Sequence, residues 1–188
     1  MSITEEQANG WRKDRNASAI KNEVDISYVY QVGFPDKLAG LFPQYVWQYP
    51  KSRAEESGRA FDVLLNSRVK IELECGTKQT DWIDSLGDVK PHWNRGLSVA
   101  TRKALPGRWD IFIKYNMNLN SFFAFTYEFF DATSVLKTGV KHSLGYKTND
   151  SFVSVPWDKI VNDPTRMVYD DFGLLEEMFK NSIDKKSD

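Results

Sequence analysis

One short stretch, AFDVLLNSRVKIELECG at residues 60–76, constrains the fold of this chain more than any other. It holds two β-rich runs, residues 60–65 and 69–75, joined by the tripeptide Asn-Ser-Arg. Two such runs around a short polar turn are typical of a β-hairpin. Because side chains alternate between the faces of a strand, the apolar residues of both runs predict one buried face.

The other face of this hairpin is acidic. Lys70, Glu72 and Glu74 alternate with apolar neighbours in the second run, and Asp62 joins them if the two runs share their apolar face. Like charges on one sheet face repel unless something offsets them. A divalent cation such as Mg²⁺ is the simplest candidate, since it binds carboxylates, waters and phosphate oxygens. Charged alternation is also common on a solvated hairpin face, so that interpretation stays open.

Composition favours a single folded domain spanning 1–188. Hydrophobic residues make up 41% and aromatic residues 14% of the 188, which excludes a disordered chain. The single cysteine cannot form an intrachain disulfide or a cysteine zinc site. A formal net charge of −1 excludes a globally basic nucleic-acid coat. The sequence has no apolar leader and no run of about 18 apolar residues, so we expect a soluble protein in the cytoplasm or elsewhere inside the cell.

Further elements are predicted on both sides of the hairpin. Short strands are expected at 45–49, 109–115, 122–126 and 152–157, and residues 81–105 are expected to be helical in part, ending at Pro106-Gly107. A helix is predicted over 127–136 and a closing helix over about 170–183, with Phe172, Leu175, Met178 and Phe179 on one face. This order predicts an α/β or α+β fold, in which helices pack on a sheet.

The segment FDVLLNSRVKIELECGTK resembles the core of the PD-(D/E)XK nuclease superfamily, in which an Asp on one strand precedes Glu-x-Lys on the next. The resemblance spans about 45–126 and implies a restriction-endonuclease-like fold, a central mixed sheet flanked by helices. Asp62 matches the family Asp and Glu72 the family Glu. Leu73 matches the residue whose backbone carbonyl often completes the metal shell.

Glu74 departs from the family pattern, because it occupies the position where the lysine usually stands. Some restriction enzymes of the superfamily also have a glutamate at this position. Lys70 on the same face or Lys78 beyond the strand could take the lysine role. Glu23 is the candidate for the upstream Glu that often assists. The resemblance implies that Asp62, Glu72, Leu73 and Glu74 hold Mg²⁺ or Mn²⁺, with Glu74 as a ligand or as the base that orients water.

A basic stretch at residues 89–114 carries six lysines and arginines against one aspartate. Basic side chains neutralise phosphates, and an exposed tryptophan can stack on an unpaired base. The sequence therefore predicts a DNA-binding surface, although solvated helix faces are an equally open interpretation. The candidates are Lys90, Trp93, Arg95, Arg102, Lys103 and Arg108.

The function expected from these features is a metal-dependent endonuclease that hydrolyses phosphodiester bonds in DNA, with an Asp-(x9)-Glu-x-Glu site. One alternative is a catalytically degenerate domain of the same fold that binds nucleic acid without cutting it. Another is a protein-interaction domain whose acidic hairpin is merely solvated. A homodimer is also possible, since many DNA-cutting enzymes of this type work as dimers.

Overall fold

The computed structural model describes residues 32–50, 61–76, 97–100, 103–116, 121–137, 152–156, 159 and 161–187. Within these residues it has three helices and nine strands. The helices are α3 (Phe34–Leu41), α5 (Tyr127–Thr133) and α6 (Phe172–Lys185). The strands are β1 (Trp47–Gln48), β2 (Val63–Leu65), β3 (Val69–Gly76), β4 (Leu97–Ala100), β5 (Ile111–Asn116), β6 (Ser121–Thr126), β7 (Val135–Lys137), β8 (Phe152–Val155) and β9 (Met167–Tyr169).

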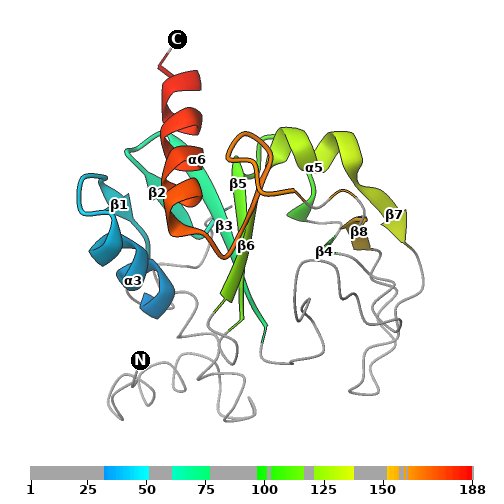
Figure 1. Ribbon diagram of the computed structural model, residues 1–188, viewed down its shortest axis with the longest axis horizontal. Coiled ribbons are helices and arrows are strands. Elements are labelled where there is room, and N and C mark those ends of the chain that lie inside the picture. The colour runs from blue at the N-terminus through cyan, green and yellow to red at the C-terminus, as the bar shows by residue number, and fades with distance from the viewer. Residues whose placement is uncertain are drawn as a thin grey trace.

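A six-stranded mixed sheet with the order β1-β2-β3-β5-β6-β9 forms the centre of the fold (Figure 1). The predicted hairpin is confirmed, because β2 pairs antiparallel with β3 and Val63 lies opposite Ile71. At its turn, Asn66 and Ser67 both have positive φ angles, as in the type I′ turn that matches the twist of a hairpin. β3 and β5 pair in parallel, whereas all other pairs in this sheet are antiparallel.

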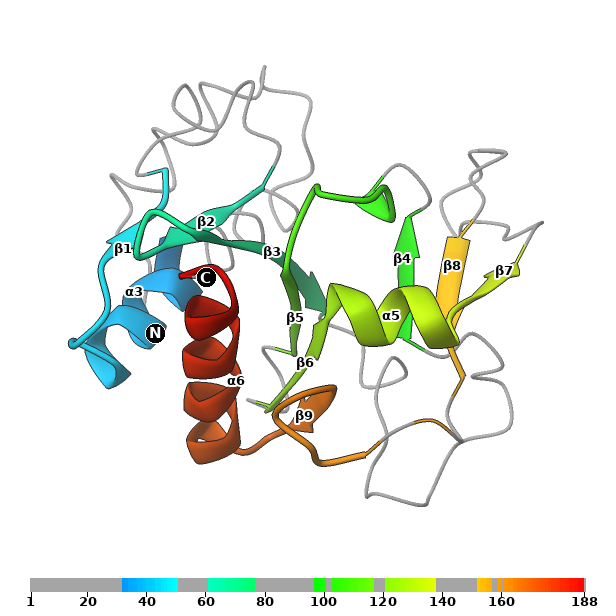
Figure 2. The ribbon, with the colours of Figure 1, turned by 90° about the horizontal axis from the view of Figure 1, so that it is seen from above.

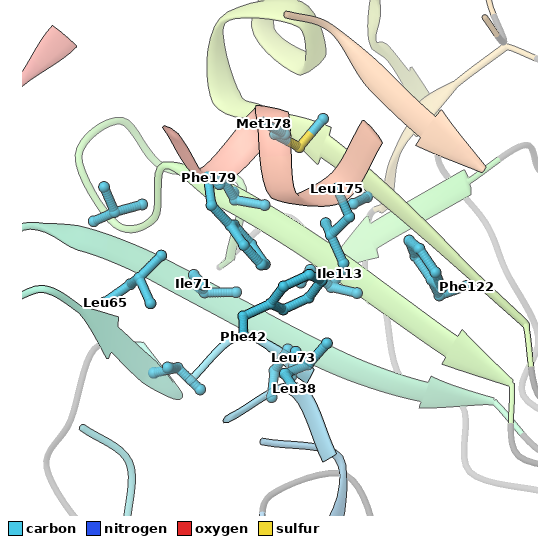
Figure 3. Close-up of a cluster of buried hydrophobic side chains, with 14 of the residues drawn as sticks. Leu38, Phe42, Leu65, Ile71, Leu73, Ile113, Phe122, Leu175, Met178 and Phe179 are labelled. Carbon is cyan, nitrogen blue, oxygen red and sulfur yellow. The ribbon is translucent and has the colours of Figure 1, made fainter. Parts of the chain in front are cut away.

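One face of this sheet is covered by α3 and α6. Leu175, Met178 and Phe179 of α6 are fully buried, which confirms the predicted apolar face of the closing helix. These side chains meet Leu38 and Phe42 above the apolar residues of β2, β3 and β5 (Figure 3). Phe179 packs edge-on against the rings of Phe42 and Trp47, so it joins α6 to the chain around α3 and β1.

The opposite face packs against α5 and a three-stranded sheet with the order β4-β8-β7 (Figure 2). Val99 of β4 and Val155 of β8 are buried in one cluster with Trp109 and Phe112. Trp109 is 1% exposed and makes edge-to-face contacts with several rings, which supply large buried areas. Both faces of the six-stranded sheet are therefore covered.

The local predictions differ from the structure in a few places. The helix predicted over 127–136 ends at Thr133, and Val135–Lys137 is strand β7 instead. The partly helical region predicted over 81–105 contains strand β4 at Leu97–Ala100. Helix α3 and strand β9 were not predicted, although Pro at the start of α3 is a known helix signal. No helix of the described residues is long and apolar enough to cross a membrane.

The contact of α6 with the sheet is open to a direct test. Replacing Phe179, which is fully buried, by Ala should lower the free energy of unfolding by about 3–5 kcal/mol, because it removes a large ring and leaves a cavity. The matched control is Glu177→Ala, at an exposed position of the same helix, with an expected change within about 0.5 kcal/mol. Urea denaturation followed by circular dichroism measures both. A loss below about 1 kcal/mol at Phe179 would contradict the packing described here.

Candidate functional site

Asp62 lies just before β2, at the end of the hairpin ladder. Regular pairing begins with Val63 opposite Ile71, and the Asp62 N–H also donates to the Ile71 carbonyl at 3.1 Å, so Asp62 packs against the same part of β3 that carries Glu72. The Leu73 N–H also donates to Asp62 Oδ2 at 2.7 Å. This bond ties the half-buried Asp62 carboxylate to the backbone of β3. The first two predicted acids are therefore neighbours.

Glu72 is a buried acid in the centre of the sheet. It is 4% exposed, and its register partner on β5 is Phe112, a residue of the aromatic cluster. An isolated buried carboxylate costs several kcal/mol, so it requires a charged or hydrogen-bonding partner. The Lys103 ammonium supplies this partner through an ion pair with Glu72 Oε1. The Lys103 side chain is 27% exposed, so it lies between the buried carboxylate and solvent.

The charges of three acids raise the pKa of Lys103, and one of these acids, Glu72, contacts it. Burial of its ammonium lowers the pKa, whereas the adjacent charge of Glu72 and their hydrogen bond raise it. The charges of Asp62 and Glu74 raise it further. The net pKa of Lys103 lies above the usual lysine value, because attraction by the three acids outweighs burial.

Two aromatic side chains hold the backbone around Lys103. The Trp109 indole Nε1–H donates to the Lys103 carbonyl at 2.6 Å. The Tyr127 hydroxyl donates to the carbonyl of Ala104, the next residue, at 3.1 Å. Both aromatic rings belong to the cluster on this face of the sheet. They therefore fix the segment that brings the lysine over Glu72.

Glu74 has a lysine partner of its own. It lies opposite Lys114 in the parallel pairing of β3 with β5, and Lys114 Nζ lies 3.3 Å from Glu74 Oε1. The Glu74 side chain is 36% exposed, so it is far more accessible than Glu72. The acidic face thus carries two lysines, Lys103 from the segment before β5 and Lys114 from β5 itself.

Lys70 has different contacts. Its Nζ donates to the Gly107 carbonyl at 2.9 Å and lies 5.9 Å from the centre of the Phe61 ring. Its backbone N–H donates to Asp110 Oδ2 at 2.7 Å, and the Lys186 ammonium also donates to that oxygen at 2.6 Å. Lys70 therefore holds together the end of the hairpin and the turn before β5. The lysine that reaches Glu72 is Lys103.

The carboxylates of Asp62 and Glu72 are hard oxygen donors of the kind that Mg²⁺ binds. Mg²⁺ is usually bound by one or two carboxylates together with waters and substrate phosphate oxygens, rather than by an all-protein cage. The described residues contain no group of three or more His, Cys, Asp and Glu side chains close enough to hold one ion. Asp62 and Glu72, whose charges both act on Lys103, offer the one or two hard oxygen ligands that this mode of binding uses.

The predicted site residues fall into three groups. In the first, Glu72 pairs with Lys103 and Glu74 with Lys114, and Asp62 accepts from the Leu73 amide, while the Leu73 side chain points into the core. Arg108 lies half-buried in the turn before β5. Glu23, Lys78, Lys90, Trp93, Arg95 and Arg102 lie outside the described residues.

Sequence reasoning placed Lys103 among the DNA-binding residues and did not connect it with Glu72. No local signal pairs the two, because they come from different elements. The one sequence signal was the buried Trp109 a few residues later, since an indole N–H in a core needs an acceptor on a nearby backbone.

No protein-family model, curated protein or solved structure matches this chain. The resemblance of the hairpin to the PD-(D/E)XK core is therefore still a prediction. The residues that bear on function are Asp62, Glu72 and Glu74 with the lysines that pair with the two glutamates.

The raised pKa of Lys103 leads to a prediction at alkaline pH. The pKa of Lys103 is higher in the folded than in the unfolded chain. The ion pair therefore stabilises the folded state fully below about pH 10.4, and this stabilisation is lost as the pH rises through the pKa of Lys103 in the folded state. Lys103→Arg stays charged throughout this range. The free energy of unfolding in urea should therefore fall less steeply for this variant than for wild type as the pH rises above about 10.4.

Lys180→Arg is the matched control, because Lys180 is exposed on α6. Its pH dependence should follow that of the wild type. Equal slopes for Lys103→Arg and wild type would show that the ion pair does not set the pKa of Lys103.

Proposed function

We propose that this chain is a metal-dependent nuclease of restriction-endonuclease-like fold that hydrolyses phosphodiester bonds in DNA. The observation that carries the proposal is the ion pair of buried Glu72 with the Lys103 ammonium, on which the charges of Asp62 and Glu74 also act. Acids that bind a cation and a lysine that contacts a phosphate are the groups that phosphodiester hydrolysis requires in one place.

The topology around these residues supports the fold proposal. The acids lie on a hairpin in the middle of a mixed sheet, and the next strand of that sheet, β5, runs parallel to β3. Helices lie on both sides of the sheet (Figure 2). A central mixed sheet flanked by helices is the arrangement that the resemblance to the nuclease superfamily implies.

The roles follow from the chemistry of each side chain. Asp62 and Glu72 would hold Mg²⁺ or Mn²⁺, which when bound polarises the scissile phosphate and lowers the pKa of a coordinated water. Glu74, which is more exposed, is suited to orient water or to add a ligand. Lys103 takes the place of the family lysine, because its ammonium can donate to a phosphate oxygen in the transition state.

The substrate side of the proposal rests on charge. Lys103 and Arg108 come from the basic stretch at residues 89–114, and Lys114 at its end contacts Glu74. Basic residues near an acidic metal site neutralise the phosphates around the reacting one. DNA is therefore the proposed substrate.

A catalytically degenerate DNA-binding domain is the second candidate. It is favoured by the ion pairs that occupy both acids of β3, Glu72 with Lys103 and Glu74 with Lys114. If these ion pairs remain in place when DNA and metal are present, the domain binds DNA through its basic residues and does not cut it.

A plasmid-nicking assay tests the proposal. With Mg²⁺ present, the wild type should nick supercoiled DNA, and EDTA should abolish the activity. Asp62→Asn keeps an acceptor for the Leu73 amide but removes the charge, and Lys103→Met removes the ammonium. Each should slow nicking by about 10²–10³-fold, the usual loss for one group that stabilises a transition state.

Lys180→Met is the matched control, because it makes the same change at an exposed site on α6 and should leave the rate within about twofold. Retention of the plasmid in gel shifts without nicking would favour the degenerate DNA-binding domain. If the wild type neither nicks the plasmid nor retains it in gel shifts, that result would contradict both functions.

A further inference from the structure

We propose that Lys103 acts as an internal cation that a divalent metal must displace from Glu72. The inference rests on the proposed function, because it concerns how the same site takes up its metal. It makes metal binding and release of the lysine one coupled event.

The first argument is burial. The Glu72 side chain is 6% exposed, and the Lys103 ammonium pairs with it from the solvent side. Mg²⁺ keeps several waters when it binds a protein, so it needs more room than a bare contact. An ion that ligates Glu72 Oε1 therefore competes with the ammonium for this oxygen.

Charge also bears on the exchange. The Lys103 ammonium brings one positive charge to Glu72, while Glu74 has its own partner in Lys114. A divalent cation attracts a carboxylate about twice as strongly as an ammonium does at equal distance. Exchange of lysine for metal therefore strengthens the attraction at Glu72, and the displaced ammonium needs another partner.

The third argument is the way Lys103 is attached. Its backbone carbonyl is held by Trp109 and the next carbonyl by Tyr127, so the backbone stays in place. The side chain has a flexible four-carbon stem and three rotatable donors. The ammonium can swing away from Glu72 while its base remains fixed beside the acids. A DNA phosphate at the metal would give it the new partner.

Calorimetric titration of Mg²⁺ into wild type and Lys103→Met tests the competition. Without its competitor, Glu72 should bind Mg²⁺ roughly tenfold more tightly, a difference of about 1.4 kcal/mol. This variant should at the same time lose nicking. Tighter binding together with lost cleavage is a combination that a merely structural lysine would not produce.

Lys70→Met is the matched control. It removes the same charge from the same face of β3, but the Lys70 ammonium contacts the Gly107 carbonyl and not Glu72. Its affinity for Mg²⁺ should change less than about threefold. An equal gain in both variants would indicate a general field effect and overturn direct competition.

A second measurement uses the wild type and so does not depend on the folding of a variant. Acetylation of Lys103 by acetic anhydride, followed by mass spectrometry, reports whether its amine is held by Glu72. Saturating Mg²⁺ should speed acetylation of Lys103 several-fold, whereas NaCl of equal ionic strength should not.

The outcomes separate this inference from the proposed function. Mg²⁺-dependent nicking with unchanged Lys103 acetylation and no gain in affinity for Lys103→Met would overturn displacement and leave the nuclease intact. Absence of both Mg²⁺ binding and nicking in the wild type would overturn the two together.

Discussion

The ion pair between Glu72 and Lys103 is the interaction on which the arrangement of this face depends. A carboxylate at 4% exposure in the middle of a sheet is costly unless a cation meets it. That cation arrives from the segment between β4 and β5, and Trp109 and Tyr127 hold this segment by their polar atoms. The aromatic cluster therefore does more than fill space, because it fixes the backbone from which the lysine reaches the acid.

The position of these charges is unusual for the strand that carries them. Both faces of the six-stranded sheet are covered, and a central strand with two covered faces is normally apolar throughout. β3 keeps this rule on one face with Ile71 and Leu73 and breaks it on the other with Glu72 and Glu74. Local rules are broken most often at functional sites. The solvated-face interpretation therefore does not fit Glu72, which is buried.

The sequence predicted what depends on neighbours along the chain. The hairpin, β5, β6 and α6 follow from alternation or helical periodicity within a few residues, and they are where they were expected. β4 was mistaken for helix because its partner β8 lies far along the chain and leaves no local pattern. For the same reason the pairing of Lys103 with Glu72 was not foreseen, although both residues had been singled out. Strand β4 and the pairing of Lys103 with Glu72 both depend on contacts between segments that lie far apart in the sequence.

The parallel pairing of β3 with β5 explains how Lys103 comes to lie beside the acids of β3. Parallel neighbours need a crossover connection, which carries the chain from the end of β3 back to the start of β5. Lys103 lies shortly before β5 in that connection, beside the face that carries the acids. The same parallel pairing sets Lys114 of β5 opposite Glu74, so each acid of β3 meets a lysine that comes from β5 or from the connection before it.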